Sequence, residues 1–441
     1  MGGEDLHEAE RLGPAPPVPE SGPRRLVRLA AIDLGPLRRH RDYRLLWIGL
    51  AVSFFGSEIS FVAIPYQVYK LTGSTAVVGL LALVALAPLL SSAIVGGALA
   101  DAVDRRRMVF ITELGLAACS AALLANALLP HPRLWVLFVV EAISAALVGF
   151  LRPSLDALTP RLVEKDELTA AGALDSLRFQ IGLMGGPVVG GLLIATVGLA
   201  GVFAIDIATF LISLVMLGLM RTAPPPPDAE RPSLRRIAEG FRYARSRPEL
   251  LGTYGVDIVA MFFGMPNALF PAFAKEFGGP AVHGLLYTAP SVGSFVATAT
   301  SGWTKRVHRH GLAVIVAASV WGVGILLLGL APNLPLALAS LALAGAADMV
   351  SGIFRSTIWN QTIPDRLRGR LAGIEQVSYS TGPLLGDVEA GIVGSLAGVR
   401  ASIVSGGVLC IVGVAVMALL LPVFRRYDAR TFVAEPVPVA P

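Results

Sequence analysis

Charged side chains are scarce in this sequence, where Asp, Glu, Lys and Arg make up 15% of the 441 residues. Soluble globular proteins carry about 25% charged residues. By contrast, 54% of this chain is hydrophobic, with a mean hydropathy of +0.68. The core of one water-soluble chain cannot bury that much apolar sequence, so lipid is the expected solvent.

The sequence contains only two cysteines and no ATP-binding loop motif. The two cysteines, Cys119 and Cys410, both fall inside apolar runs, so the sequence predicts neither a structural disulfide nor a metal site. No Gly-x-x-x-x-Gly-Lys-Ser/Thr loop occurs, which excludes an ATP-driven pump on this chain. We therefore expect no cofactor, no metal and no enzymatic activity.

Apolar runs of about 20 residues recur throughout, and each can cross a hydrocarbon core of about 30 Å as a helix. Strands of about ten alternating residues are absent from the pattern, so a membrane barrel is not expected. The predicted fold is an all-α polytopic membrane protein with twelve transmembrane helices. The expected spans are 45–69, 76–100, 108–129, 134–153, 169–197, 199–220, 250–274, 281–303, 311–331, 334–356, 369–396 and 400–424.

Basic residues are distributed unevenly between the two sides of this topology. Of the 36 Lys and Arg, only Lys70, Arg133, Lys275 and Arg400 fall on one side. Cytoplasmic loops of membrane proteins carry the excess of basic residues, so both termini are expected to be cytoplasmic. The expected location is the inner or plasma membrane of the cell. Basic residues spread over short loops indicate topology, so no nucleic-acid partner is expected.

The chain divides into two halves that echo each other. A proline-rich linker with a short amphipathic helix at about 233–246 separates spans six and seven. "GGPVVGG" in span five matches "TGPLLGD" in span eleven, where the repeat motif is Gly382, Pro383 and Gly386. Internal six-span repeats are typical of transporters that hold their substrate between the halves. The predicted organisation is a cytoplasmic tail (1–44), a first half (45–221), the linker (222–249), a second half (250–424) and a second tail (425–441).

Two motifs resemble the major facilitator superfamily. In "GALADAVDRRRM", Gly97, Asp101, Arg105 and Arg106 match the family's loop between spans two and three, whereas Ala102 and Asp104 depart from it. "GLMGGPVVGG" is similar to the antiporter motif of exporting members. Its matching residues are Gly182, Gly186, Pro187, Gly190 and Gly191. The resemblance covers the whole membrane region and includes the branch of siderophore, macrolide and multidrug exporters.

The resemblance implies roles for both motifs. In the family the loop aspartate faces the start of helix eleven, so Asp101 is expected to latch the two halves when the inner mouth is shut. The alternative is that Asp101 and the arginines only set topology. Glycines four residues apart on span five are expected to let helix backbones approach closely. The alternative there is ordinary close packing.

Acids inside membrane spans are costly and are functional candidates by default. In this fold the first helix of each three-helix unit lines the cavity, and each such span carries one acid, namely Glu58, Glu141, Asp257 and Asp348. Glu58, near the middle of span one, is the favoured proton carrier, although Ser57 and Ser60 could instead fix it as a carboxylate. Asp348 ranks second, and Arg355, seven residues on along the same helix face, could hold it charged.

The other acids within spans are weaker candidates. Asp257 lies nearer the cytoplasmic end, where water could solvate it, and Glu141 lies toward the outside. The remaining candidates are Asp206 in span six and Glu375, Asp387 and Glu389 in span eleven. Arg178 of span five is an expected charge partner for the acids of span eleven, and the alternative is that they form only a structural ion pair.

The predicted function is proton-coupled export of a small amphiphilic molecule by alternating access. The cavity looks net acidic, which favours a neutral or cationic drug or secondary metabolite over an anionic siderophore, the alternative. A nutrient importer, the rival from another class, would not need the antiporter motif. The expected partners are the substrate, protons and membrane lipids, and the expected assembly is a monomer.

Overall fold

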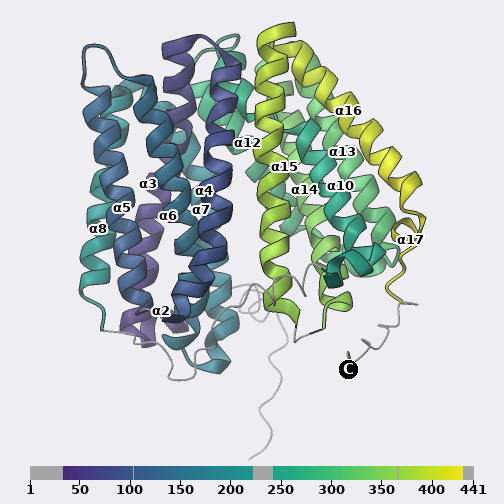
Figure 1. The fold of residues 1–441 in the computed structure, drawn as a ribbon, viewed down its shortest axis with the longest axis horizontal. Coiled ribbons are helices and arrows are strands. Elements are labelled where there is room, and N and C mark those ends of the chain that lie inside the picture. Colours follow the sequence, from purple (N-terminus) through teal and green to yellow (C-terminus); the bar gives the residue numbers. More distant parts are fainter. Residues whose placement is uncertain (1–32, 103, 222–241, 365–366, 431–441) are drawn as a thin grey trace, which may run out of the picture.

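The computed structural model of this chain describes residues 33–102, 104–221, 242–364 and 367–430. Within these ranges the side chains of 93–102, 156–157, 368–370 and 372–374 lie outside the description. Every regular element in the described ranges is a helix. Ten of these helices are long and apolar enough to cross a membrane, and α12 and α15 run beside them in the same bundle (Figure 1). The predicted all-helical membrane fold is therefore confirmed.

The first half begins with a short helix, α2, at Gly35–Arg39. Six long helices follow it. They are α3 (Arg41–Thr72), α4 (Thr75–Ala102), α5 (Arg105–Ala127), α6 (Leu134–Leu158), α7 (Leu168–Thr196) and α8 (Gly198–Gly218).

The second half resumes after residues 222–241, which lie outside the described part of the chain. Most of the predicted amphipathic helix at 233–246 falls there. The second-half helices are α10 (Pro248–Gly264), α11 (Phe270–Ala274), α12 (Pro280–Ala299), α13 (His310–Leu330), α14 (Leu334–Thr362), α15 (Arg368–Ala397), α16 (Val399–Leu420) and α17 (Pro422–Arg425).

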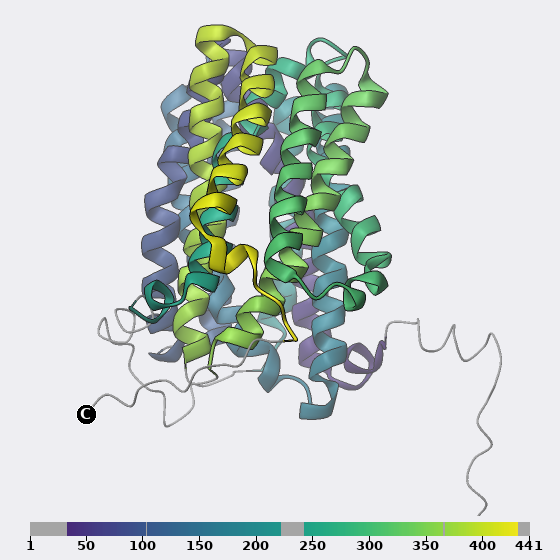
Figure 2. The ribbon, with the colours of Figure 1, turned by 90° about the vertical axis from the view of Figure 1, so that its right-hand side faces the viewer.

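The helices pack in the same pattern in both halves. In the first half α3 packs against α7 and α8, α5 packs against α6 and α8, and α4 packs against α6. In the second half α10 packs against α15 and α16, α13 packs against α14 and α16, and α12 packs against α14. The internal repeat read from the sequence thus reappears as a structural repeat, with the two bundles side by side (Figures 1 and 2).

We call the end of the bundle that holds the α3–α4, α7–α8 and α15–α16 turns the far end, and the opposite end, where α3 begins, the terminal end. Each of those turns contains a glycine with positive φ, namely Gly73, Gly198 and Gly398. Side chains other than glycine rarely adopt this backbone conformation, so glycine permits the sharp reversals.

Contacts between the halves gather toward the far end. α4 packs against α15 and α7 packs against α12. The Thr75 hydroxyl donates to Gly391 O at 2.9 Å near the far end, and Gln180 Nε2 donates to Ser291 O at 3.2 Å near the middle of α7 and α12. At the far end Lys275 also lies over the Tyr69 ring, 4.5 Å from its centroid.

The seventh span occupies the predicted range 250–274, but its helix is interrupted. α10 ends at Gly264, and Met265 is extended, with φ −101° and ψ 105°. Pro266 follows, and its ring disfavours helical backbone at the residue before it. A 3₁₀ turn at Asn267–Leu269 then leads into α11. Asp387 of α15 accepts a hydrogen bond from Ala268 N at 3.0 Å, so a side chain satisfies the restarted helix.

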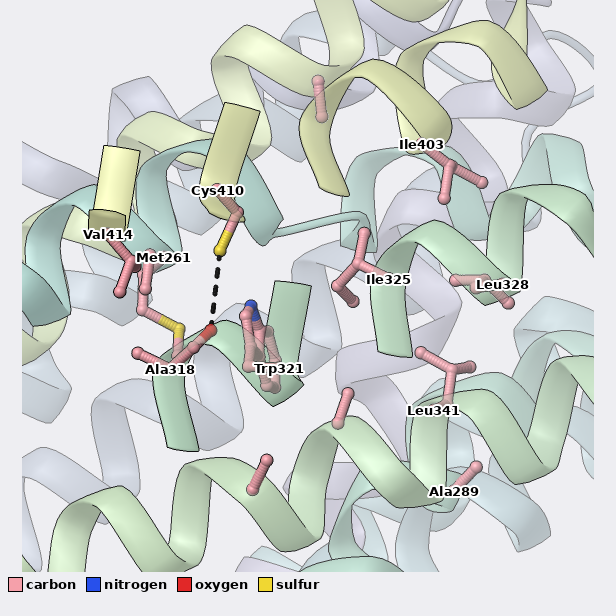
Figure 3. Close-up of a cluster of buried hydrophobic side chains, with 14 of the residues drawn as sticks. Met261, Ala289, Ala318, Trp321, Ile325, Leu328, Leu341, Ile403, Cys410 and Val414 are labelled. Atoms are coloured by element: carbon pink, nitrogen blue, oxygen red, sulfur yellow. Dashed lines mark hydrogen bonds between the residues drawn. The ribbon is translucent and has the colours of Figure 1, made fainter. Parts of the chain in front are cut away.

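A large apolar core holds the second half together. It joins α10, α12, α13, α14 and α16 through residues such as Met261, Leu341 and Ile403 (Figure 3). Cys410 lies within it and its thiol contacts Ala318 O at 3.8 Å.

The opposite faces of many helices stay apolar and exposed. Leu419 is 72% exposed and Val215 is 58% exposed. Soluble monomers rarely expose such continuous apolar surface, and a bilayer covers it.

Candidate functional site

An arginine buried in the second half holds two predicted acids together. Nη2 of Arg355 lies 3.2 Å from Oδ1 of Asp348 on the same helix, and Nη1 pairs with Asp257 of α10. The guanidinium also lies over the Tyr379 ring of α15, 5.3 Å from its centroid. We call Asp257, Asp348 and Arg355 the arginine cluster.

Burial differs across the arginine cluster. The side chains of Arg355 and Asp257 are 4% and 6% exposed, whereas that of Asp348 is 40% exposed. The expectation that water could simply solvate Asp257 is therefore wrong, because Asp257 is enclosed and paired with Arg355. The cluster sets two carboxyl groups against one permanent cation, and only Asp348 is open enough to exchange a proton readily.

Glu58 lies near the middle of α3 on the side that meets α7. A Cβ added to Gly186 of α7 would overlap Cβ of Glu58, so this acid stands at a close contact between the two helices. The side chain is half-buried. Ser60 was an alternative partner that could fix Glu58, but its hydroxyl donates to Asp206 instead, at 2.8 Å.

Glu141 lies half-buried on α6. Its charge interacts with Tyr287, which comes from α12 in the other half, and so does that of Asp387. The Tyr287 hydroxyl donates to Asn267 O at 3.2 Å, beside the break in the seventh span. Two candidate acids from different halves therefore lie near one tyrosine.

The expected pairing of Arg178 with the acids of span eleven is wrong. Nε of Arg178 lies 3.7 Å from Oδ1 of Asp175, one turn away on the same helix. Its other electrostatic neighbours, Tyr43 and Glu113, belong to the first half. The reason is topological, because α7 packs against α3 and α12 while α15 packs against α4 and α10.

The predicted latch can be traced only in part. Gly97 and Asp101 belong to the end of α4 whose side chains lie outside the described residues. Asp104 caps α5 by accepting from Arg107 N at 3.2 Å. Arg106 donates at 2.8 Å to the carbonyls of Leu217 and Gly218 at the end of α8. Arg106 thus satisfies a helix C-terminus within its own half, and Arg105 is buried beside it.

The glycines of the antiporter motif line two helix contacts of α7. Gly182, Gly186 and Gly190 face α3, and a Cβ on Gly190 would lie 2.7 Å from Ile59 O. Gly191 instead faces α12, where a Cβ would lie 2.6 Å from Pro280 O. Pro187 lies between them inside an unbroken helix. An added Cβ at Gly186, Gly190 or Gly191 would meet Cβ or backbone atoms of the neighbouring helix, so only glycine fits there without the helices moving apart, whereas at Gly182 it would meet the Phe54 ring.

The repeat motif occupies the matching place in the second half. Gly382 and Gly386 of α15 face α10, next to Met261, and Pro383 lies between them within the helix. Helix five of each half therefore uses the same glycine–proline motif against helix one of that half. The sequence similarity between the motifs reflects an equivalent packing role.

Two polar features escaped the sequence reasoning. Glu113 of α5 is 2% exposed and lies beside Ser53 and Ser213. The sequence does contain a pattern that could have identified Glu113, because acids and serines recur at a seven-residue spacing on three different spans. Asp387 was considered only as a weak acid, whereas the structure shows it bonded to the broken seventh span.

Two helical halves with the same packing and with acids buried among their membrane-crossing helices define a membrane transporter of the major facilitator superfamily. The match of residues 31–438 to the family described as transmembrane secretion effector is more specific. The chain belongs to that family.

Relatives similar along nearly the whole chain are enterobactin exporters. The chain is 30% identical over 413 residues to the enterobactin exporter EntS of Citrobacter koseri, covering 92% of this chain and 98% of that protein. It is 29% identical over 401 residues to EntS of Shigella boydii serotype 4, covering 90% and 95%.

Solved transporters share the fold at low sequence identity. A peptide transporter of the POT family superposes with a TM-score of 0.70 at 15% identity, covering 92% of this chain and 100% of that one. A bacterial homologue of the lysosomal transporter Spinster gives 0.69 at 15% identity, with coverages of 92% and 100%. These similarities concern the fold alone.

Proposed function

We propose that this protein is a proton-coupled exporter of a small amphiphilic molecule. The observation that carries the proposal is the arginine cluster, in which one arginine lies against a buried and a half-exposed aspartate. With both carboxylates ionised the cluster has a net charge of −1, and one proton on Asp348 makes it neutral. A site that changes charge within a membrane span can couple a proton gradient to a conformational change.

Alternating access would use the helix contacts described above. Contacts between the halves at the far end seal one side, and the Asp101 latch would seal the other. Glu58 lies at the α3–α7 contact, so gain or loss of its proton would act directly on the packing that the glycine–proline motif sets. Glu141 and Asp387, which lie near Tyr287, would sense the same rearrangement from the far end.

The substrate we favour is neutral or cationic. Buried Arg355 and half-buried Arg178 both lie beside aspartates within the spans, so neither offers an unopposed charge to an anion. A siderophore is the second candidate, and the similarity of nearly the whole chain to enterobactin exporters favours it. We further propose an inner or plasma membrane location, cytoplasmic termini and a monomeric protein.

Flux measurements in vesicles test this proposal. The purified protein is reconstituted, and uptake of a fluorescent cationic dye and of a catecholate siderophore is followed under an imposed pH gradient with an acidic lumen. Molecules reconstituted with their cytoplasmic side facing outward should concentrate the substrate in the lumen while protons leave it. A protonophore should abolish this accumulation. Uptake that ignores the pH gradient for every substrate would reject proton coupling.

A further inference from the structure

Three helices of the first half bury a polar layer away from the α3–α7 contact. Asp206 of α8 is 2% exposed, and its Oδ2 accepts hydrogen bonds from Ser60 of α3 at 2.8 Å and from Ser120 of α5 at 2.7 Å. The Thr209 hydroxyl donates to the backbone oxygen of Asp206 at 2.7 Å. One carboxyl oxygen is thus held by two hydroxyl groups from two neighbouring helices.

A second layer repeats the first. Glu113 of α5, also 2% exposed, lies beside Ser53 of α3 and Ser213 of α8. Each member lies seven residues from its counterpart on the same helix, a spacing of about 10.5 Å along the axis. Each layer therefore takes one residue from each of α3, α5 and α8 and contains one acid and two serines. The pairs are Ser53 and Ser60, Glu113 and Ser120, and Asp206 and Ser213.

Each acid has one carboxyl oxygen to which the described residues donate no hydrogen bond. Among the residues that the structure describes, Oδ1 of Asp206 and Oε2 of Glu113 are fully enclosed without a hydrogen-bond partner. Oδ1 of Asp206 points at Gly56 of α3, where an added Cβ would lie 2.9 Å from it. An ionised oxygen enclosed in this way is costly, whereas a protonated one is a neutral hydroxyl.

The charged groups around the layers do not offset both acids. From α7, Arg178 interacts with Glu113, but its Nε lies against Asp175. Within the layers the two acids repel each other. From α6, Glu141 adds another negative charge near Cys119, the neighbour of Ser120. Glu113 shares Arg178 with Asp175, whereas Asp206 and Glu141 have no ion-pair partner in the described part of the first half. A proton is therefore the ligand that best relieves the layers.

We propose that the acid–serine layers of α3, α5 and α8 form a second proton-binding site, held inside the first half and separate from the α3–α7 and arginine-cluster sites. Asp206 binds its proton on Oδ1 while Oδ2 keeps both serine bonds. The three helices that form the layers all belong to the first half. A proton bound there therefore does not compete with substrate bound between the halves. It acts on transport by setting how tightly α8 and α5 hold α3, and this role in transport rests on the proposed proton-coupled function.

Infrared spectroscopy of the purified full-length protein in lipid tests proton binding directly. Protonated carboxyl groups give a C=O band distinct from that of carboxylates, and the band is followed from acid to alkaline pH. Asp206→Asn keeps the shape and an oxygen acceptor for both serines, so we expect the folded variant to lose one component of the acid band that wild-type protein retains at neutral pH. Glu113→Gln should remove a second component.

Asp428→Asn is the matched control. Asp428 lies outside the spans, and its hydrogen bonds to Arg430 hold the pKa of its carboxyl well below its usual range. It is ionised at neutral pH, so its replacement should leave the acid band unchanged. An acid band that is the same in wild type, Asp206→Asn and Glu113→Gln over the whole pH range would overturn the proposal.

Two further measurements keep the proposal open to refutation. If Asp206→Asn does not fold, Ser60→Ala with Ser120→Ala removes the donors that stabilise the carboxylate, and the acid band should then persist to higher pH; an unshifted band would overturn the site. Replacing choline by sodium at fixed pH should leave the band unchanged, and its loss would assign a sodium site instead. Transport is not measured, so failure of proton-driven export and failure of proton binding here are separate results.

Discussion

Gly79 sets how closely α4 and α15 approach at the far end, and Gly79→Ala should loosen that contact. A Cβ there would lie 2.6 Å from Asp387 O and 3.2 Å from Cα of Val388. Comfortable carbon–oxygen contacts begin at about 3.3 Å, so the backbones must separate by roughly 0.7 Å. Overpacking of this kind costs about 1–3 kcal/mol. If the cost falls only on the state with a sealed far end, the equilibrium shifts about 5- to 150-fold toward the state in which that end opens.

Distance measurements between the halves would detect the shift. In a background with Cys119→Ala and Cys410→Ala, spin labels are placed at Leu71→Cys on α3 and Leu396→Cys on α15. Both positions are exposed, Leu71 by 39% and Leu396 by 82%, and they belong to opposite halves near the far end. Pulsed electron paramagnetic resonance should show the longer-distance population rising in the Gly79→Ala protein.

Gly172→Ala is the matched control, because a Cβ on Gly172 of α7 meets nothing within 4 Å. It makes the same chemical change in a helix without adding a contact. If Gly79→Ala and Gly172→Ala give the same distance distribution, the reasoning that the α4–α15 contact seals the far end is wrong.

Three further predictions concern Glu58, the arginine cluster and the latch. Glu58→Gln should abolish uphill export driven by a pH gradient while substrate exchange persists, because exchange needs no net proton movement; unaltered pH dependence in vesicle flux argues against Glu58 as the carrier. Arg355→Leu should lower the free energy of unfolding by about 3–5 kcal/mol, because it leaves buried Asp257 without its cation. Arg355→Leu with Asp257→Leu should recover most of that loss in thermal unfolding, and equal losses in both proteins contradict the pairing. Asp101→Asn should stop export at normal protein levels, and unimpaired export in cells would reject the latch.

The helices could be predicted well because a membrane span is a local property of the sequence. The predicted span 45–69 lies within α3, Arg41–Thr72, and differs only at ends where polar residues continue the helix into the headgroup region. The break near Pro266 could not be foreseen in the same way. Pro65, Pro187 and other prolines lie inside unbroken helices, so a proline alone does not predict an end. The oxygen that satisfies the restarted helix comes from Asp387, 119 residues along the chain.

The charge partners show the same division between local and distant information. Asp348 and Arg355 lie seven residues apart on one helix, so the sequence could predict their ion pair, which the structure contains. The third member, Asp257, comes from another helix, and the partner of Arg178 depends on which helices α7 contacts. Glu113 was missed because its meaning depends on serines from two other helices. Sequence patterns thus identified candidate acids, while packing decided which of them have partners.

The two halves stabilise their buried acids by different means, and this asymmetry bears on where a proton binds. In the second half a permanent cation, Arg355, offsets the charge of Asp257 whatever the pH. In the first half Asp206 has only hydroxyl donors, which can serve a carboxylate or a neutral acid with little rearrangement. A cation keeps Asp257 charged, whereas hydroxyl groups tolerate loss of the charge on Asp206, so the acids suited to gain and release protons are Asp348 in the second half and Asp206 in the first. Neutralising Asp206 should therefore change the pH dependence of export, whereas Asp257→Asn should mainly lower stability, and the opposite result would assign a proton to Asp257 and none to Asp206.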